Sequence, residues 1–287
     1  MSNAVQAGSP DLSLPETRRD KLGLFSATVL VVANMVGAGI FTTSGFIMQE
    51  LRNPWALLAC WAVGGLFALA GALCYGELGA RYPRAGGEYV FLRESFGEPV
   101  AFLSGWVSLL VGFSAPIAAG AMAFAVYFFG SAGVRPDPGF TWTFHGVTVL
   151  TLSPVTLLAS GVVLVFSFIH RHSLFLGSRV QNLLTLFKVA LILAFIFLAL
   201  GWGTGTLAHL GEPPPVSFYF SGRFATSLIF ITFAYSGWNA ATYIGSEIKR
   251  PDKNLPLSLI LGTGAVMVLY LGLNFIYVYA LAPRAIP

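Results

Sequence analysis

Charged residues are scarce in this sequence. Only 10% of its 287 residues are Asp, Glu, Lys or Arg, whereas 56% are hydrophobic and the mean hydropathy is +0.75. Soluble domains carry about 25% charged residues, so the composition excludes a soluble globular protein and predicts a chain that crosses a lipid bilayer several times. The net charge of +4 does not indicate a nucleic-acid partner, because basic residues in membrane proteins gather in cytoplasmic loops.

The sequence also offers little reactive chemistry. Its two cysteines, Cys60 and Cys74, lie in one apolar segment, about 21 Å apart at the rise of a helix, so they cannot form a disulfide with each other. The apolar segments contain no cluster of His, Asp and Glu, no serine–histidine pair and no metal-ligand spacing. These features argue against a membrane enzyme, and neither a cofactor nor a metal is expected.

Long apolar runs fill most of the chain and predict an all-α integral membrane fold. At about 20 apolar residues per span, seven spans are predicted, at 22–49, 54–78, 99–130, 153–170, 180–202, 222–246 and 256–282. Residues 1–21 are polar and are predicted to form a cytoplasmic tail. Most of the Lys and Arg residues outside the spans then fall on the side of this tail, and the positive-inside rule places the N-terminus in the cytoplasm.

The first span is expected to break near Gly37. Gly37 and Gly39 each cost roughly 1 kcal/mol relative to alanine in a helix, and Thr42, Thr43 and Ser44 can start a new helical turn by capping. A half-helix that starts near Ile40 presents free N–H groups and about half a positive charge, which suits a carboxylate. The alternative interpretation is a glycine-rich contact where a neighbouring helix packs closely.

The sixth span carries a similar pattern, with a second break predicted at Ser236–Gly237. Polar side chains mark one face of this span at helical spacing: Thr232, Tyr235, Ser236, Asn239, Thr242, Tyr243 and Ser246. The carbonyl groups freed at the end of the first half-helix present negative partial charge, which suits an ammonium group. Two broken helices in corresponding places indicate a transporter site between inverted repeats, and together they can hold a zwitterion.

The fifth span carries one polar stripe, in which Asn182, Thr185 and Lys188 recur at intervals of three residues. Such a stripe is expected to face protein and not lipid. Lys188 in mid-helix would cost at least about 2.5 to 3.5 kcal/mol against lipid, which makes it a functional candidate by default. The alternative is that its long stem snorkels to the inner interface.

These segments together resemble the amino acid-polyamine-organocation (APC) superfamily of transporters, and within it the bacterial relatives of the L-type amino acid transporters. The resemblance covers essentially the whole membrane portion. It rests on four motifs that occur in the order typical of the family: Gly37–Phe41, Tyr75–Tyr89, Phe233–Asn239 and Gly245–Pro256.

The resemblance implies a five-plus-five inverted repeat. Residues 22–202 would form the first repeat, with helices 1 to 5, and residues 222–287 would begin the second, with helices 6 and 7. The later helices of the family have no counterpart in this sequence, so the chain is expected to be C-terminally truncated, and the function is assigned to the complete protein.

The resemblance also implies roles for individual residues. The backbone around the first break would hold the substrate carboxylate, and carbonyl groups around the second break would take the amino group. The implied substrate-binding residues are Gly37, Ala38, Gly39, Ile40, Phe233, Ala234, Tyr235, Ser236 and Asn239. Phe233 matches the aromatic gate that closes over the substrate, and Lys188 matches a lysine that replaces sodium in sodium-independent members and is the predicted coupling residue.

The expected function is secondary active transport of amino acids across the cell membrane by alternating access, either proton-coupled or by exchange. One alternative is a polyamine or organic cation transporter, which would need acidic residues within the spans, whereas Glu77 and Glu247 lie at span ends. Another is a non-transporting membrane receptor that keeps the fold and the pocket. A channel is disfavoured, because two broken half-helices with an aromatic lid suit occlusion better than a continuous pore.

Overall fold

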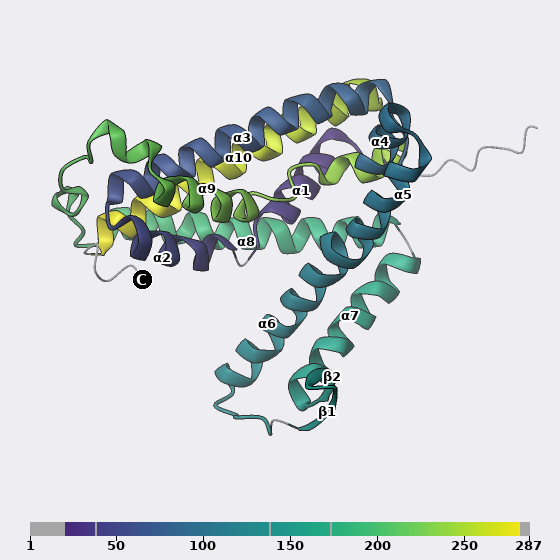
Figure 1. Ribbon diagram of the computed structural model, residues 1–287, viewed down its shortest axis with the longest axis horizontal. Coiled ribbons are helices and arrows are strands. Elements are labelled where there is room, and N and C mark those ends of the chain that lie inside the picture. Colours follow the sequence, from purple (N-terminus) through teal and green to yellow (C-terminus); the bar gives the residue numbers. More distant parts are fainter. Residues whose placement is uncertain (1–20, 38, 138, 173, 282–287) are drawn as a thin grey trace, which may run out of the picture.

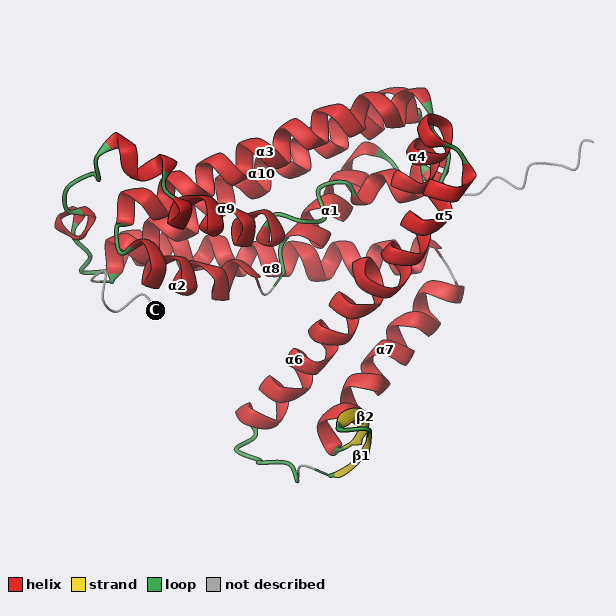
Figure 2. Ribbon diagram, viewed as in Figure 1, coloured by secondary structure: helices red, strands yellow, loops and turns green. Residues whose placement is uncertain are grey.

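A computed structural model of the protein describes residues 21–37, 39–137, 139–172 and 174–281. The predicted tail at 1–20 and the predicted site residue Ala38 lie outside the described residues. The described chain is mostly helical, and a small hairpin of two strands lies at the tip of a helical arm (Figure 2).

The elements follow one another along the chain with short connections. In order they are α1 (Leu24–Met35), α2 (Gly39–Leu51), α3 (Pro54–Arg81), α4 (Glu88–Phe96), α5 (Glu98–Val107), the π-helical η1 (Ser108–Ser114), α6 (Ala115–Ser131), β1 (Phe140–Phe144), β2 (Val147–Leu152), α7 (Pro154–His172), α8 (Leu174–Trp202), the 3-10 helices η2 (Leu207–Leu210) and η3 (Val216–Phe220), α9 (Gly222–Ala234), the 3-10 helix η4 (Ala240–Glu247) and α10 (Pro251–Ala280).

Several of these helices can cross a membrane by length and composition. Four do so individually, at 54–81, 98–131, 176–202 and 251–280, and α1 with α2 forms a fifth apolar unit that is bent by 42°. The segments 154–169 and 222–234 are apolar but shorter. Every one of the seven predicted ranges therefore contains helix, and up to five spans in the described residues meet the length and composition criteria of a multi-pass membrane protein.

Helices α3 and α10 lie side by side along most of their length and form the most extensive helix pair of the described chain (Figure 1). Small residues on α3 permit this close approach. A Cβ atom added at Gly79 would lie 2.4 Å from the Leu255 side chain, and one at Gly76 would lie 3.2 Å from the backbone of Pro256. Larger residues at either position would force the two helices apart.

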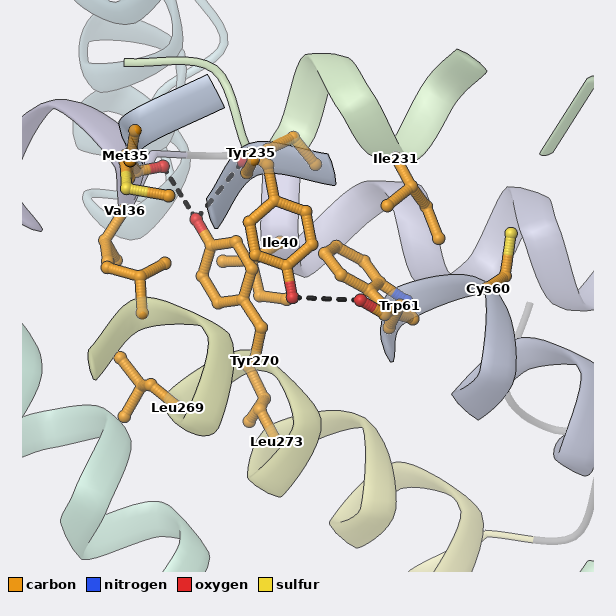
Figure 3. Packing of buried hydrophobic residues seen from close by; sticks show 14 of the residues in the cluster. Met35, Val36, Ile40, Cys60, Trp61, Ile231, Tyr235, Leu269, Tyr270 and Leu273 are labelled. Carbon is orange, nitrogen blue, oxygen red and sulfur yellow. Dashed lines mark hydrogen bonds between the residues drawn. The ribbon is translucent and has the colours of Figure 1, made fainter. Parts of the chain in front are cut away.

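Three aromatic side chains, Trp61, Tyr235 and Tyr270, form the centre of the core (Figure 3). Each comes from a different element, and their ring centroids lie 5.1 to 5.6 Å apart in tilted or edge-to-face geometry. The Tyr235 hydroxyl donates to the Trp61 carbonyl at 3.1 Å. This cluster ties α3 and α10 to the turn that follows α9, and so it fixes the place where the predicted second break occurs.

Helices α5, η1, α6 and α7 form an arm that projects from the rest of the molecule (Figure 1). Pro116 lies in the first turn of α6, and proline cannot donate a helical hydrogen bond. The turns before it are π-helical, and Ser114 Oγ donates to the Leu109 carbonyl at 2.6 Å. Neither the π-helical form nor the β1–β2 hairpin was predicted from the sequence.

Candidate functional site

The first candidate site element is the interruption between α1 and α2. Helix α1 ends at Met35 and α2 begins at Gly39, close to the predicted positions. The side chain of Val36 is buried, whereas Gly37 is exposed. The first N–H groups of α2, from Gly39 onward, have no acceptor within their own helix, and they carry the positive end of its dipole.

The second element is the turn between α9 and η4. Helix α9 ends at Ala234, and Gly237 adopts a φ of +100°, a conformation that favours glycine. Beyond it the chain continues as a 3-10 helix and not as the expected regular half-helix. Both the N–H and the Oγ1 of Thr242 donate to the Asn239 carbonyl, at 2.9 and 2.7 Å, and this pattern favours the tighter 3-10 winding.

The two interruptions pack against each other. A Cβ atom added at Gly39 would lie 3.4 Å from Cα of Ala234, so the start of α2 lies against the end of α9. A Cβ atom at Gly237 would lie 2.8 Å from the carbonyl carbon and oxygen of Asn34, so the second turn lies against the end of α1. The positive end of one helix and the negative end of another therefore meet at one place.

Tyr270 of α10 contacts the carbonyl ends of both interrupted helices (Figure 3). Its buried hydroxyl donates to the Met35 carbonyl at 2.6 Å and lies 3.3 Å from the Ala234 carbonyl. Tyr270 was not among the residues predicted from the sequence. The available signal was a polar group on an apolar helix, because a buried tyrosine hydroxyl requires a hydrogen-bond partner.

Lys188 of α8 also contacts the end of α1. Its Nζ donates to the Val36 carbonyl and, at 3.2 Å, to the Ala33 carbonyl, both at the end of α1. The rest of the polar stripe also faces protein: Asn182 donates to Ser26 Oγ at 3.3 Å. The ammonium group of Lys188 is therefore hydrogen-bonded inside the protein. Its role in coupling stays a prediction.

The remaining predicted site residues have mixed surroundings. Phe233 is 72% exposed, and its carbonyl accepts from the N–H of Ser236 at 3.1 Å. The side chains of Ile40 and Tyr235 are buried in the core, so these two residues can offer a substrate their backbone groups. Asn239 is partly buried and donates from its amide to Glu88 of α4. Within the described part of the chain, no group of three His, Cys, Asp or Glu side chains could hold a metal ion.

Comparison with known proteins identifies the family of this chain. Residues 22–287 match a family model described as amino acid permease. The chain belongs to the amino acid permease family. This membership confirms the resemblance to APC-superfamily transporters that the motifs indicated.

Similar members of this permease family come from several animals. The b(0,+)-type amino acid transporter 1 of Mus musculus is 31% identical over 272 residues, which cover 92% of this chain and 52% of the relative. Amino acid transporter protein 6 of Caenorhabditis elegans is 31% identical over 281 residues, or 97% of this chain and 51% of the relative. The large neutral amino acids transporter small subunit 2 of Mus musculus is 30% identical over 271 residues, which cover 93% of this chain and 49% of the relative.

This permease chain spans about half the length of the curated relatives that it matches. The relatives are transporters and not enzymes, in agreement with the expectation that the chain is not an enzyme. Together with the apolar helices, the family identifies a multi-pass membrane protein.

Proposed function

We propose that the full-length protein transports amino acids across the cell membrane by alternating access, as a proton-coupled carrier or an exchanger. The observation that carries the proposal is the meeting of the two interruptions, where Gly39 at the start of α2 lies against Ala234 at the end of α9. An α-amino acid has a negative and a positive group on adjacent carbons. A helix N-terminus beside a helix C-terminus offers complementary charge to both.

In this proposal the substrate carboxylate accepts hydrogen bonds from backbone N–H groups around Ala38, Gly39 and Ile40. The substrate ammonium group donates to carbonyl groups of Phe233, Ala234 and Ser236. The carbonyl oxygen of Phe233 already accepts from the N–H of Ser236, but a carbonyl oxygen has two lone pairs and can accept a second donor. The carbonyl oxygen of Ala234 lies 3.3 Å from the Tyr270 hydroxyl, which donates to Met35, so it too can accept the ammonium group.

The proposed inverted repeat is supported by which elements pack together. Helix α3 packs against α10, α2 against α9, and α1 against η4. These are the pairs expected when residues 22–202 form one repeat and residues 222–287 begin the second. The N-terminus then lies in the cytoplasm, together with the α3–α4 loop and the end of η4. Leu22 supports this arrangement, because it pairs with Ile248 just beyond η4.

The first prediction tests the substrate class. Purified full-length protein in liposomes is expected to take up radiolabelled neutral amino acids, and methyl esters of the same amino acids are expected to compete about tenfold less well or worse. Esterification removes the charge that the α2 amides would bind, and hydrogen bonds to charged groups contribute about 1.5 to 3 kcal/mol each.

The design separates the alternatives. Equal competition by acid and ester would contradict the carboxylate assignment. A diamine that competes better than any amino acid would favour a polyamine carrier. Binding without flux, measured on the same preparation, would favour a receptor.

The second prediction concerns Phe233 as a gate over the bound substrate. Phe233→Ala is expected to leave the fold intact, because the side chain is 72% exposed, and to raise the apparent KM about tenfold through loss of apolar contact with the substrate. The matched control is Phe230→Ala, one turn earlier on α9 and 55% exposed. Parental KM and rate in Phe233→Ala, measured by initial uptake, would exclude the gate role.

A further inference from the structure

The loop between α3 and α4 lies directly on η4. The N–H of Gly86 donates to the Tyr243 carbonyl at 3.1 Å. Gly87 is buried with a φ of +53°, and a Cβ atom there would lie 2.7 Å from the Tyr243 ring. No larger residue fits in this position. The two glycines therefore allow Glu88, the first residue of α4, to reach the side chains of η4 and of the turn before it.

The Glu88 carboxylate accepts two hydrogen bonds, one at each oxygen. Asn239 Nδ2 donates to Oε1, and the Tyr243 hydroxyl donates to Oε2. Asn239 Nδ2 also lies 3.2 Å from the Tyr243 hydroxyl, and the Tyr243 ring packs edge-to-face on Phe113 at 5.0 Å. The basic residues of the same region, Arg84 and Arg93, pair with Glu94 instead, at 3.4 and 3.5 Å.

This arrangement fixes which way the Asn239 amide points. Oε1 of Glu88 accepts the hydrogen bond, so the NH₂ group of Asn239 faces Glu88. The usual ambiguity between the two ends of an amide is thereby removed. The amide oxygen, Oδ1, is turned to the side away from Glu88, two residues beyond the Gly237 turn.

We propose that Glu88 is a positioning residue for the substrate ammonium group, acting through Asn239. By holding the NH₂ end of the amide, Glu88 leaves Oδ1 of Asn239, five residues after the end of α9, as a further acceptor. Glu88 does not itself contact the substrate. This inference rests on the proposed function, since it assigns a role in recognising an amino acid, and it adds a residue outside the two interruptions.

The first test uses Glu88→Met, which keeps an unbranched side chain and removes both acceptor oxygens. Binding of a radiolabelled amino acid to the purified full-length protein is expected to weaken about tenfold, the effect of one charge-assisted hydrogen bond. Competition by the desamino analogue, the same acid without its amino group, is expected to change less than about twofold. An equal loss for both ligands would indicate a general structural role and overturn the proposal.

The conservative variant Glu88→Gln serves as the rescue. Its single amide oxygen can still accept from Asn239, so affinity is expected to stay within about threefold of the parent. In an Asn239→Ala background, Glu88→Met is expected to cause no further loss, because the residue through which it acts is gone. Additive losses in this cycle would also overturn the proposal.

A swap of the two groups covers the case in which Glu88→Met fails to fold. Asn239→Asp alone places two carboxylates together and is expected to weaken amino acid binding more than tenfold, since the pair repels. Adding Glu88→Gln restores a donor facing an acceptor and is expected to recover most of that loss. A double variant as weak as Asn239→Asp alone would contradict the positioning role.

Glu77→Gln is the matched control, because Glu77 is 69% exposed and pairs with Arg81 on the surface of α3. It is expected to bind like the parent. The proposed function and the positioning role of Glu88 can be refuted separately. A parent protein that binds no amino acid would refute the proposed function. A parent that binds amino acids while Glu88→Met binds them equally well would refute this inference alone.

Discussion

Lys188→Ala is expected to reduce amino acid uptake at least about a hundredfold while much of the protein still reaches the membrane. Nζ of Lys188 donates to the carbonyl groups of Val36 and Ala33 at the end of α1. Two charge-assisted hydrogen bonds contribute about 3 to 6 kcal/mol together. Their loss leaves two carbonyl groups without their donor at the place where α1 must stay aligned with α2.

The measurement is initial uptake normalised to the amount of protein in liposomes. The matched control is Leu183→Ala, on the same helix and 70% exposed. Lys188→Met keeps the length of the side chain without the charge and is expected to behave like Lys188→Ala. A fully active Lys188→Ala would favour the alternative in which this residue merely snorkels to the interface.

The same contact predicts how the carrier is coupled. An ammonium group on the carbonyl groups of α1 occupies the kind of position that a bound cation would take, so uptake is expected to be unchanged when sodium is replaced by choline. An imposed pH gradient then separates the two forms of coupling. Faster uptake into empty vesicles indicates proton coupling, and uptake only into preloaded vesicles indicates exchange. Strong sodium dependence would contradict the assignment of Lys188.

The sequence was most informative where a local feature decides the structure. Glycine lowers helix stability at the position where it occurs, so the end of α1 at Met35 and the positive φ of Gly237 follow from the residues nearby. The polar stripe on α8 could be assigned to a protein-facing side because the cost of a lysine in lipid is large.

Contacts between residues far apart in the chain could not be predicted from such local features. Tyr270 reaches Met35 across a separation of 235 residues, and Glu88 reaches Asn239 across 151. Hydrophobic periodicity tells which face of a helix is apolar but not which helix lies opposite. The Tyr75–Tyr89 segment was recognised as a motif, yet its contact with η4 depends on two glycines whose importance appears when the packing is known.

Gly39→Val is expected to abolish amino acid binding. A Cβ atom at Gly39 would lie 3.4 Å from Cα and 3.5 Å from Cβ of Ala234, which is ordinary contact, so Gly39→Ala is expected to retain binding. The additional methyl groups of valine extend beyond this Cβ position and are expected to overpack the contact with Ala234, at a cost of about 1 to 3 kcal/mol. They would also lie beside the first N–H groups of α2, where the carboxylate is proposed to bind.

Those two effects of Gly39→Val can be separated by a second substitution. Ala234→Gly removes the methyl group that lies opposite, so the double variant is expected to regain thermal stability relative to Gly39→Val. It is not expected to regain binding, because the valine methyl groups still obstruct the α2 amides. Gly264→Val is the control, since a Cβ atom there meets nothing within 4 Å. Recovery of binding along with stability would show that Gly39 serves helix packing, and the substrate carboxylate would then have to bind elsewhere.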